Sequence, residues 1–298
     1  MSSKNCKLED KGEEDIFIEE VENIDVRVFI PKGEKPEGGW PLCMYFHGGG
    51  WVLGGIETEN TVCTNLCSRG EVVVISVDYR LAPENPYPTA PNDCQTALLS
   101  ILTHPTHYSL PINPSLLALS GSSAGGNIAA VLSHRFSSLP TPIPISLQLL
   151  IVPVTDNSAS AKAYASWREN EFSPALPAEK MLWFRRHYLP NEENWEDVDA
   201  SPLLNVGGWE KQPRTLVVVG ELDVLRDEGV VYVEKVERAG VECRLEVMKG
   251  MPHPFLAMDG VLKQGADTIT YMVEELRDVF WKGKSGGEDR LLDIAYDL

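Results

Sequence analysis

LLALSGSSAGGN, residues 116–127, is the stretch of sequence that decides the expected fold. Its first residues are mostly apolar, as in a buried strand, and a helix is predicted to begin near Ala124. Between them lies a Gly-x-Ser-x-Gly turn, which is too tight for side chains at positions 121 and 125 and lifts the hydroxyl of Ser123 to the end of the strand. The start of the helix directs its dipole and free N–H groups toward negative charge that develops there. We therefore predict that Ser123 is a nucleophile; the alternative is a Gly/Ser-rich turn that only caps a helix.

Strand-like and helix-like segments alternate on both sides of this turn. Runs of strand length occur at 16–21, 24–30, 41–46, 71–77, 116–120, 146–152, 215–220 and 241–248. Segments with helical periodicity lie at 58–69, 90–104, 124–137, 226–239 and 264–281. This alternation predicts an α/β fold with a mostly parallel sheet of about eight strands and helices on both faces. The first two strands are joined tightly at Glu22 and Asn23, which indicates a hairpin at the edge of the sheet.

A second glycine-rich motif, HGGGW (His47–Trp51), follows the predicted strand at 41–46. Its three consecutive glycines leave backbone N–H groups free to point into a pocket where a side chain would clash. Together with the N–H of Ala124, those of Gly49 and Gly50 can hold the oxyanion of a tetrahedral intermediate. We predict these three residues as the oxyanion hole.

A serine nucleophile needs a base, and the base needs a carboxylate that orients it. Asp223 lies three residues beyond one predicted strand, and His253 lies five residues beyond the next. Of the six histidines, only His253 follows the candidate acid on a loop after a strand. Glu221 and Asp227 compete with Asp223, but Asp227 falls inside the next predicted helix. Serine, aspartate and histidine in this order along the chain are typical of the α/β-hydrolase fold.

Residues 156–205 interrupt the alternation after the sixth predicted strand. The segment is too long for an ordinary loop and too aromatic for a disordered linker, so we predict a helical cap inserted into a single domain that spans residues 1–298. Caps of this kind cover substrate pockets. The large apolar side chains of the segment either line such a pocket or form the small core of the cap. The candidate substrate-binding residues are Trp51, Ser122, Met181 and Phe184.

The composition argues against nucleic acids and membranes as partners. The chain has 44 acidic and 26 basic residues and a formal net charge of −18, which repels phosphate backbones and anionic lipids. It has no apolar run of membrane-spanning length, and its beginning, MSSKNCKLEDKGEEDIFIEE, lacks both the apolar core of a secretory signal and the Arg-rich pattern of a transit peptide. We expect a cytoplasmic protein without membrane insertion that acts on a small molecule.

Two further features concern metals and assembly. Cys63 and Cys67 are four residues apart, but no histidine or second cysteine pair accompanies them, so we expect two buried helix residues, no metal and no cofactor. After Trp281 a polar linker leads into the amphipathic RLLDIAYDL, and residues 282–298 form a predicted C-terminal tail. This tail is either a frayed end or a segment that docks on a second subunit of a homodimer.

Five motifs follow one another along the chain: HGGGW (47–51), DYRLAPENPYPTAPND (78–93), GSSAGGN (121–127), DVLRDE (223–228) and HPF (253–255). In order and spacing they resemble the hormone-sensitive-lipase-like carboxylesterases, a branch of the α/β-hydrolases, over roughly residues 24–281. The resemblance implies an α/β-hydrolase fold and a serine carboxylesterase that works through an acyl-enzyme without a cofactor. The proline-rich motif is mainly structural, and Asp93 is expected to cap the helix that follows it.

One position departs from that family. Its members usually have Asp immediately before the nucleophile, where Ser122 stands here, so a negative charge beside Ser123 is expected to be missing. The expected activity is hydrolysis of small to medium esters, apolar or aromatic in view of the cap. The alternatives are an amidase or formamidase, a tailoring hydrolase of specialised metabolism (deacetylase, lactonase or non-hydrolytic), and a non-catalytic ligand receptor. Retention of His253 argues against the receptor.

Overall fold

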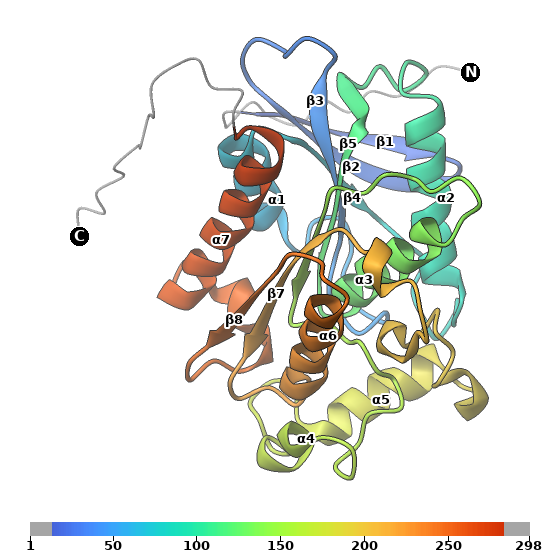
Figure 1. Ribbon diagram of the computed structural model, residues 1–298, viewed down its shortest axis with the longest axis vertical. Helices are drawn as coiled ribbons and strands as arrows, with labels where there is room; N and C mark the ends of the chain where they lie inside the picture. Colours follow the sequence, from blue (N-terminus) through green and yellow to red (C-terminus); the bar gives the residue numbers. More distant parts are fainter. Residues whose placement is uncertain (1–13, 283–298) are drawn as a thin grey trace.

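A sheet of eight strands runs through the centre of the molecule, in the order β1-β2-β4-β3-β5-β6-β7-β8 (Figure 1). The computed structural model describes residues 14–282. The strands are β1 (Glu14–Val21), β2 (Ile24–Pro31), β3 (Trp40–Phe46), β4 (Val73–Val77), β5 (Ile112–Ser122), β6 (Leu147–Ile151), β7 (Arg214–Gly220) and β8 (Cys243–Met248). From β4 to β8 all neighbours pair in parallel, whereas β1 and β2 are antiparallel. The predicted mostly parallel, eight-stranded sheet is confirmed.

The β1–β2 hairpin forms where it was predicted. Glu22 and Asn23 form the turn, and both have positive φ angles, 53° and 64°. A two-residue turn with left-handed backbone at both positions has the twist that matches the flanking strands. Because β2 pairs antiparallel with β4, this hairpin extends one edge of the sheet.

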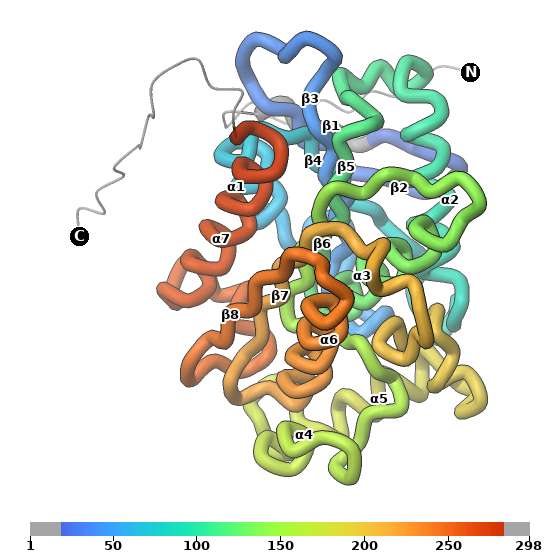
Figure 2. The backbone as a smooth tube through the Cα atoms, viewed as in Figure 1, coloured from blue at the N-terminus to red at the C-terminus, as the bar shows by residue number. Residues whose placement is uncertain are grey.

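Helices cover both faces of the sheet (Figures 1 and 2). On one face lie α1 (Asn60–Gly70) and α7 (Lys263–Phe280); on the other lie α2 (Thr89–Thr103), α3 (Ala124–Ser137) and α6 (Arg226–Arg238). Side chains of a strand point alternately to its two faces, and β3 shows the result. Met44 and Phe46 pack in the core cluster that contains α2, α3 and α6, whereas Cys43 and Tyr45 pack in the cluster that contains α1 and α7. Both faces are therefore apolar, which explains why the parallel strands read as continuous hydrophobic runs.

The segment between β6 and β7 includes residues 156–205, for which a helical cap was predicted. It folds into α4 (Ala165–Glu169), α5 (Ala178–Tyr188) and three short 3-10 helices, η1 (Glu192–Asn194), η2 (Pro202–Leu204) and η3 (Trp209–Lys211). A further 3-10 helix, η4 (His253–Met258), follows β8. In Figure 1, α4 and α5 lie together at the lower end of the view.

The expectation for Asp93 was wrong. Asp93 does not cap α2 but lies inside it, past the first turn, and its buried carboxylate accepts hydrogen bonds from Arg80. Nε of Arg80 is 2.9 Å from one carboxylate oxygen and Nη2 is 2.7 Å from the other. This bidentate pairing holds the loop after β4 against α2. Asp93 therefore has a structural role as the partner of Arg80 and not as a helix cap.

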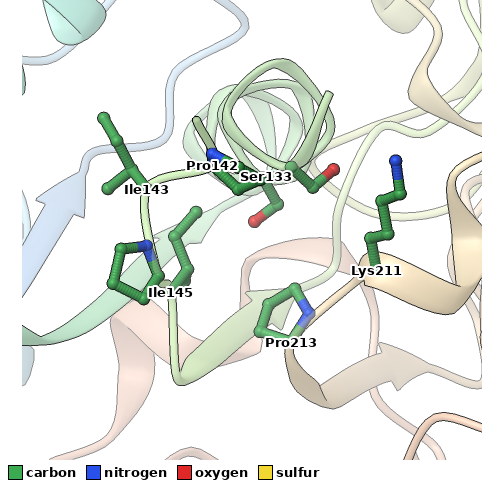
Figure 3. Close-up of a pocket in the computed structure, with 8 residues that line it drawn as sticks. Ser133, Pro142, Ile143, Ile145, Lys211 and Pro213 are labelled. Atoms are coloured by element: carbon green, nitrogen blue, oxygen red, sulfur yellow. The ribbon is translucent and has the colours of Figure 1, made fainter. Parts of the chain in front are cut away.

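A surface hollow of about 240 Å³ lies between the end of α3 and the segments that lead into β6 and β7 (Figure 3). Its lining includes Ser133, Ile143, Ile145, Lys211 and Pro213. The strands β6 and β7 begin here. The hollow therefore lies at the amino ends of these parallel strands, opposite the carboxyl ends, where the loops after β3, β5, β7 and β8 lie. In the described part of the chain, no helix has the length and apolar character needed to cross a bilayer. The predicted tail at 282–298 lies outside the described residues, apart from Lys282.

Candidate active site

The loop after β5 has the geometry of a strained turn. Ser123 stands between the last residue of β5 and the first of α3, with φ 53° and ψ −114°. This backbone conformation is unfavourable for a residue with a side chain, and such strain concentrates at functional sites. A Cβ atom on Gly125 would lie 1.8 Å from the carbonyl oxygen of Phe46, so only glycine fits there. The close approach of α3 to the end of β3 therefore requires the second glycine of the motif.

The structure brings the three predicted triad residues together. Nε2 of His253 is 2.8 Å from Oγ of Ser123, and Nδ1 of His253 is 2.7 Å from Oδ2 of Asp223. They come from the ends of β5, β7 and β8, which are parallel strands whose carboxyl ends share one edge of the sheet. Sequence positions that are far apart thus meet because of the strand order.

The hydrogen bonds define the protonation pattern of His253. A carboxylate can only accept, so Nδ1 donates to Asp223 and the lone pair of Nε2 is left to accept from the hydroxyl of Ser123. The side chain of Asp223 is buried, with 1% of it exposed, and its other oxygen accepts from the N–H of Leu225 at 3.0 Å. Asp223 is therefore fixed from both sides, and the lone pair of Nε2 of His253 points at the serine hydroxyl.

The glycine loop after β3 supplies free backbone donors. Across residues 14–282, the N–H groups of Gly49 and Gly50 donate to no protein acceptor. Ala124 is the first residue of α3, where backbone N–H groups have no partner within the helix. These are the three donors predicted for the oxyanion hole.

His47, at the start of the glycine loop, serves the loop and not the triad. Its ring stacks on Tyr79 with 4.3 Å between ring centroids, and its Nδ1 lies 2.7 Å from the carbonyl oxygen of Gly48. The hydroxyl of Tyr79 donates to the carbonyl oxygen of His47 at 2.7 Å. Burial lowers the pKa of His47, which favours the neutral ring in this packed position.

Helix α5 of the insert packs against the glycine loop through aromatic side chains. The ring of Tyr188 stacks on Trp51, with 4.1 Å between ring centroids and 5° between ring planes. A Cβ atom on Gly50 would lie 2.4 Å from Cγ of Phe184, and Gly50 has a φ angle of +61°. This helix thus covers the loop so closely that position 50 admits no side chain.

The segment around α4 is attached to the acid loop after β7 by hydrogen bonds. Nδ2 of Asn170 donates to the carbonyl oxygens of Asp223, at 2.9 Å, and Glu221, at 3.3 Å. Oγ of Ser166 donates to the carbonyl oxygen of Val224 at 2.7 Å. The insert therefore fixes the backbone that carries the candidate acid.

The four candidate substrate-binding residues are packed against protein. Trp51 is fully buried under Tyr188, and Met181 and Phe184 are buried in the same hydrophobic core cluster. The hydroxyl of Ser122 donates to Oε1 of Glu59. These contacts are the protein's own, and a role in substrate binding stays a prediction.

Glu59 was not among the predicted site residues. It lies at the N-cap of α1 but makes no capping bond, and its carboxylate instead accepts from Ser122, from Tyr45 OH at 2.9 Å and from Gly48 N–H at 3.3 Å. Burial raises the pKa of Glu59, and the three hydrogen bonds oppose that rise. The signal in the sequence was the absent carboxylate at position 122, and the structure places the Glu59 carboxylate within hydrogen-bonding distance of the hydroxyl at that position.

A family model described as the alpha/beta hydrolase fold matches residues 43–257. The chain belongs to the α/β-hydrolase family. This α/β hydrolase is 49% identical over 244 residues to an AB hydrolase superfamily protein of Schizosaccharomyces pombe, covering 81% of this chain and 71% of that protein. It is 32% identical over 257 residues to the protein named ethyl acetate hydrolase from Pseudomonas putida, covering 85% of this chain and 78% of that protein.

Solved structures agree with this assignment. EstE1, a thermophilic carboxylesterase cloned from a metagenomic library, matches this α/β hydrolase with a TM-score of 0.81 and 34% identity, covering 91% of this chain and 90% of that one. Carboxyl esterase 2 from the fungus Tuber melanosporum matches with a TM-score of 0.82 and 25% identity, covering 92% and 90%. The resemblance to the hormone-sensitive-lipase-like carboxylesterases is confirmed.

Proposed function

We propose that this α/β hydrolase is a serine carboxylic-ester hydrolase that works through an acyl-enzyme. The observation that carries the proposal is the chain of two short hydrogen bonds, 2.7 Å from Asp223 to His253 and 2.8 Å from His253 to Ser123. A carboxylate, an imidazole and a hydroxyl in this sequence activate serine for attack on a carbonyl carbon. The relatives named as esterases and the ethyl acetate hydrolase of Pseudomonas putida support an ester as the substrate.

The first half-reaction forms the acyl-enzyme. His253 accepts the proton of Ser123 as Oγ attacks the ester carbonyl, and Asp223 stabilises the imidazolium that results. The N–H groups of Gly49, Gly50 and Ala124 bind the oxyanion. When the tetrahedral intermediate collapses, the bond to the leaving alkoxide breaks and His253 gives its proton to it, which releases the alcohol.

The second half-reaction repeats the same steps with water. His253 removes a proton from water as the hydroxide attacks the acyl carbon on Ser123. The oxyanion forms again in the same donor set, and collapse returns the proton to Oγ of Ser123. The products are a carboxylic acid and the free enzyme.

We further propose that the substrate is a small to medium apolar or aromatic ester. Three exposed apolar side chains belong to the loops that carry the catalytic groups. Leu53 lies in the glycine loop, Leu222 immediately precedes Asp223, and Met258 ends the 3-10 helix that begins at His253. Their exposed fractions are 54%, 42% and 44%. Exposed apolar side chains in the segments next to the catalytic groups favour an apolar substrate.

Replacing the nucleophile tests the reaction class. Ser123→Ala is expected to lower kcat for a short-chain aryl ester by about 10⁶-fold, as removal of a serine nucleophile does in other hydrolases. The measurement is steady-state hydrolysis of aryl esters of graded acyl length, with a matched aryl amide to test amidase activity. Wild type is also expected to be labelled at Ser123 by a fluorophosphonate.

The control is Ser133→Ala, a serine of α3 in the hollow at the opposite edge of the sheet. It is expected to keep wild-type turnover and labelling. Turnover that survives in Ser123→Ala, with a thermal transition like that of wild type, contradicts the proposed nucleophile. Faster hydrolysis of the amide than of the ester contradicts the substrate class.

A further inference from the structure

Glu59 occupies a position that connects three parts of the active site. One carboxylate oxygen accepts from the hydroxyl of Ser122, the residue next to the nucleophile. The other accepts from the N–H of Gly48, the residue next to the first oxyanion donor, at 3.3 Å, and from the hydroxyl of Tyr45 in β3 at 2.9 Å. A single carboxylate thus holds the serine turn, the glycine loop and the end of β3 in one arrangement.

We propose that Glu59 is a positioning residue of the active site, which fixes the glycine loop against the serine turn and supplies a negative charge behind the nucleophile. Glu59 touches none of the reacting atoms, and it acts through Gly48 and Ser122. The inference rests on the proposed function, because it concerns how the same site is assembled. It also changes the meaning of Ser122, whose hydroxyl serves as a link to a carboxylate that another element provides.

The hydrogen bonds and the charge of Glu59 have separable consequences. The transition state contains an imidazolium and an oxyanion, so a fixed negative charge attracts one and repels the other, and its net effect on kcat is small. The free enzyme at low pH contains the imidazolium alone, which a nearby carboxylate stabilises. We therefore expect kcat to depend on the hydrogen bonds that residue 59 makes. We expect the acidic limb of the pH profile of kcat/KM to depend on the charge of residue 59.

Other groups that face Glu59 do not obscure this limb. Burial raises the pKa of each of the tyrosines and of the thiol among them, so these groups stay neutral at acidic pH. The titratable groups that interact with Glu59 are Tyr45 of β3, Cys63 of α1, Tyr79 after β4, and His253.

Three variants of the full-length chain test the two effects. Glu59→Ala removes every hydrogen bond of the carboxylate and is expected to lower kcat about tenfold, with KM changed less than about twofold, as loss of one charge-assisted interaction would. Glu59→Gln keeps an acceptor for Gly48 and Tyr45 and a donor for Ser122, so its kcat is expected within about threefold of wild type. Its acidic limb is expected to move to lower pH, because the imidazolium loses a stabilising charge.

The third variant, Ser122→Asp/Glu59→Gln, transfers the carboxylate from position 59 to position 122, the other end of the same hydrogen bond. The amide introduced at position 59 can donate to the carboxylate introduced at position 122 and still accept from Gly48, so the arrangement is kept and the charge is restored. We expect its acidic limb to return to that of wild type. All rates are measured with one short-chain aryl ester and are scaled to active sites counted with a fluorophosphonate.

Glu57→Gln is the matched control, since it removes an equal charge two residues away, from a side chain that is 75% exposed and paired with Arg27. It is expected to leave both kcat and the acidic limb unchanged. The proposal is overturned if Glu59→Ala keeps wild-type kcat, if the limb of Glu59→Gln does not move, or if Glu57→Gln moves it equally. If the acidic limb of the double variant stays displaced from that of wild type, the proposed effect of the charge is overturned.

Two measurements keep failures distinct. If wild type shows no turnover that depends on Ser123, the proposed function fails, whatever the Glu59 variants do. If wild type turns over and the variants at position 59 behave like it, only the positioning role fails. Should Glu59→Ala not fold, as judged by its thermal transition, the near-isosteric Glu59→Gln and the double variant carry the test.

Discussion

The two halves of the insert meet the catalytic loops in different ways. Around α5 the contact with the glycine loop is aromatic: Tyr188 stacks on Trp51, and Phe184 lies over Gly50. Around α4 the contact with the acid loop is polar, and Asn170 donates to the carbonyl oxygens of Asp223 and Glu221. The α5 half holds the glycine loop by aromatic packing, and the α4 half holds the acid loop by hydrogen bonds.

The difference follows from what each loop must do. If the glycine loop is the proposed oxyanion hole, its N–H groups have to stay unpaired, so its shape can only be held by packing and by bonds to its other groups. The acid loop has no such demand, and its carbonyl oxygens are free to accept from the insert. Added volume at a tightly packed contact forces the packed elements apart, whereas one hydrogen bond can be removed while the others remain. The two halves should therefore respond differently to substitution.

The largest effect is expected on the aromatic side, from Gly50→Ala. The new Cβ would lie 2.4 Å from Cγ of Phe184, at a φ of +61° that alanine disfavours, so either the loop or α5 must move. Displaced oxyanion donors are expected to lower kcat by about 10²-fold to 10³-fold. Steady-state kinetics with an aryl ester measures this loss.

Gly207→Ala is the control, because a Cβ atom there meets nothing within 4 Å. It is expected to keep the wild-type rate. If Gly50→Ala also keeps that rate, the close packing of α5 on the glycine loop does not constrain the donors.

On the polar side, Asn170→Ala is expected to have a smaller effect. It removes one donor from each of two carbonyl oxygens of the acid loop, which still accept from Arg226, and adds no volume, so the loop can partly keep its position. We expect kcat to fall about tenfold and the free energy of unfolding to fall by about 1–3 kcal/mol. Kinetics and urea unfolding measure the two quantities. The exposed Asn191, at the start of η1, gives a control variant, Asn191→Ala, that should change neither; equal losses in both variants would argue against a specific role for Asn170.

The smallest effect is expected from Tyr188→Phe, which separates packing from hydrogen bonding. In the described part of the chain, the buried hydroxyl of Tyr188 has no hydrogen-bond partner. Its removal keeps the stacked ring and relieves a buried polar group, so the free energy of unfolding should rise by about 1 kcal/mol with kcat unchanged. Tyr164→Phe gives the opposite sign, since the Tyr164 hydroxyl donates to Asp156 at 2.8 Å. A loss of stability in Tyr188→Phe would mean that its hydroxyl is satisfied.

The sheet could be predicted from the sequence because its signals are local. Continuous apolar runs such as that of β7 mark strands buried on both faces, and the short link at Glu22 and Asn23 marks a hairpin. The role of Asp93 could not be predicted, because its partner is Arg80, a residue on the preceding loop. A carboxylate near a helix start can equally cap that helix or pair with a cation, and only the folded structure distinguishes them.

The meeting of the three candidate triad residues was predictable, because the proposed chemistry dictates their type and order. Ser123, Asp223 and His253 each follow a strand, and parallel strands place such loops together. Glu59 was not predictable, because a carboxylate 63 residues before Ser122 has no local pattern that links the two. Its contact depends on the fold bringing the start of α1 within reach of Tyr45 in β3 and Ser122 in β5. The departure at Ser122 indicated that something was missing but not where it would be supplied.

Ser123 and His253 are separated by 130 residues, and that distance has a consequence for synthesis of the chain. A ribosome that adds about 5–20 residues per second reaches the histidine on the order of ten seconds after the serine. During that interval the nascent chain holds the candidate nucleophile and the predicted oxyanion donors without the candidate base. The geometry of the candidate triad can form only after β8, the outermost strand on its side of the sheet, and the following loop with His253 have left the ribosome and β8 has paired with β7.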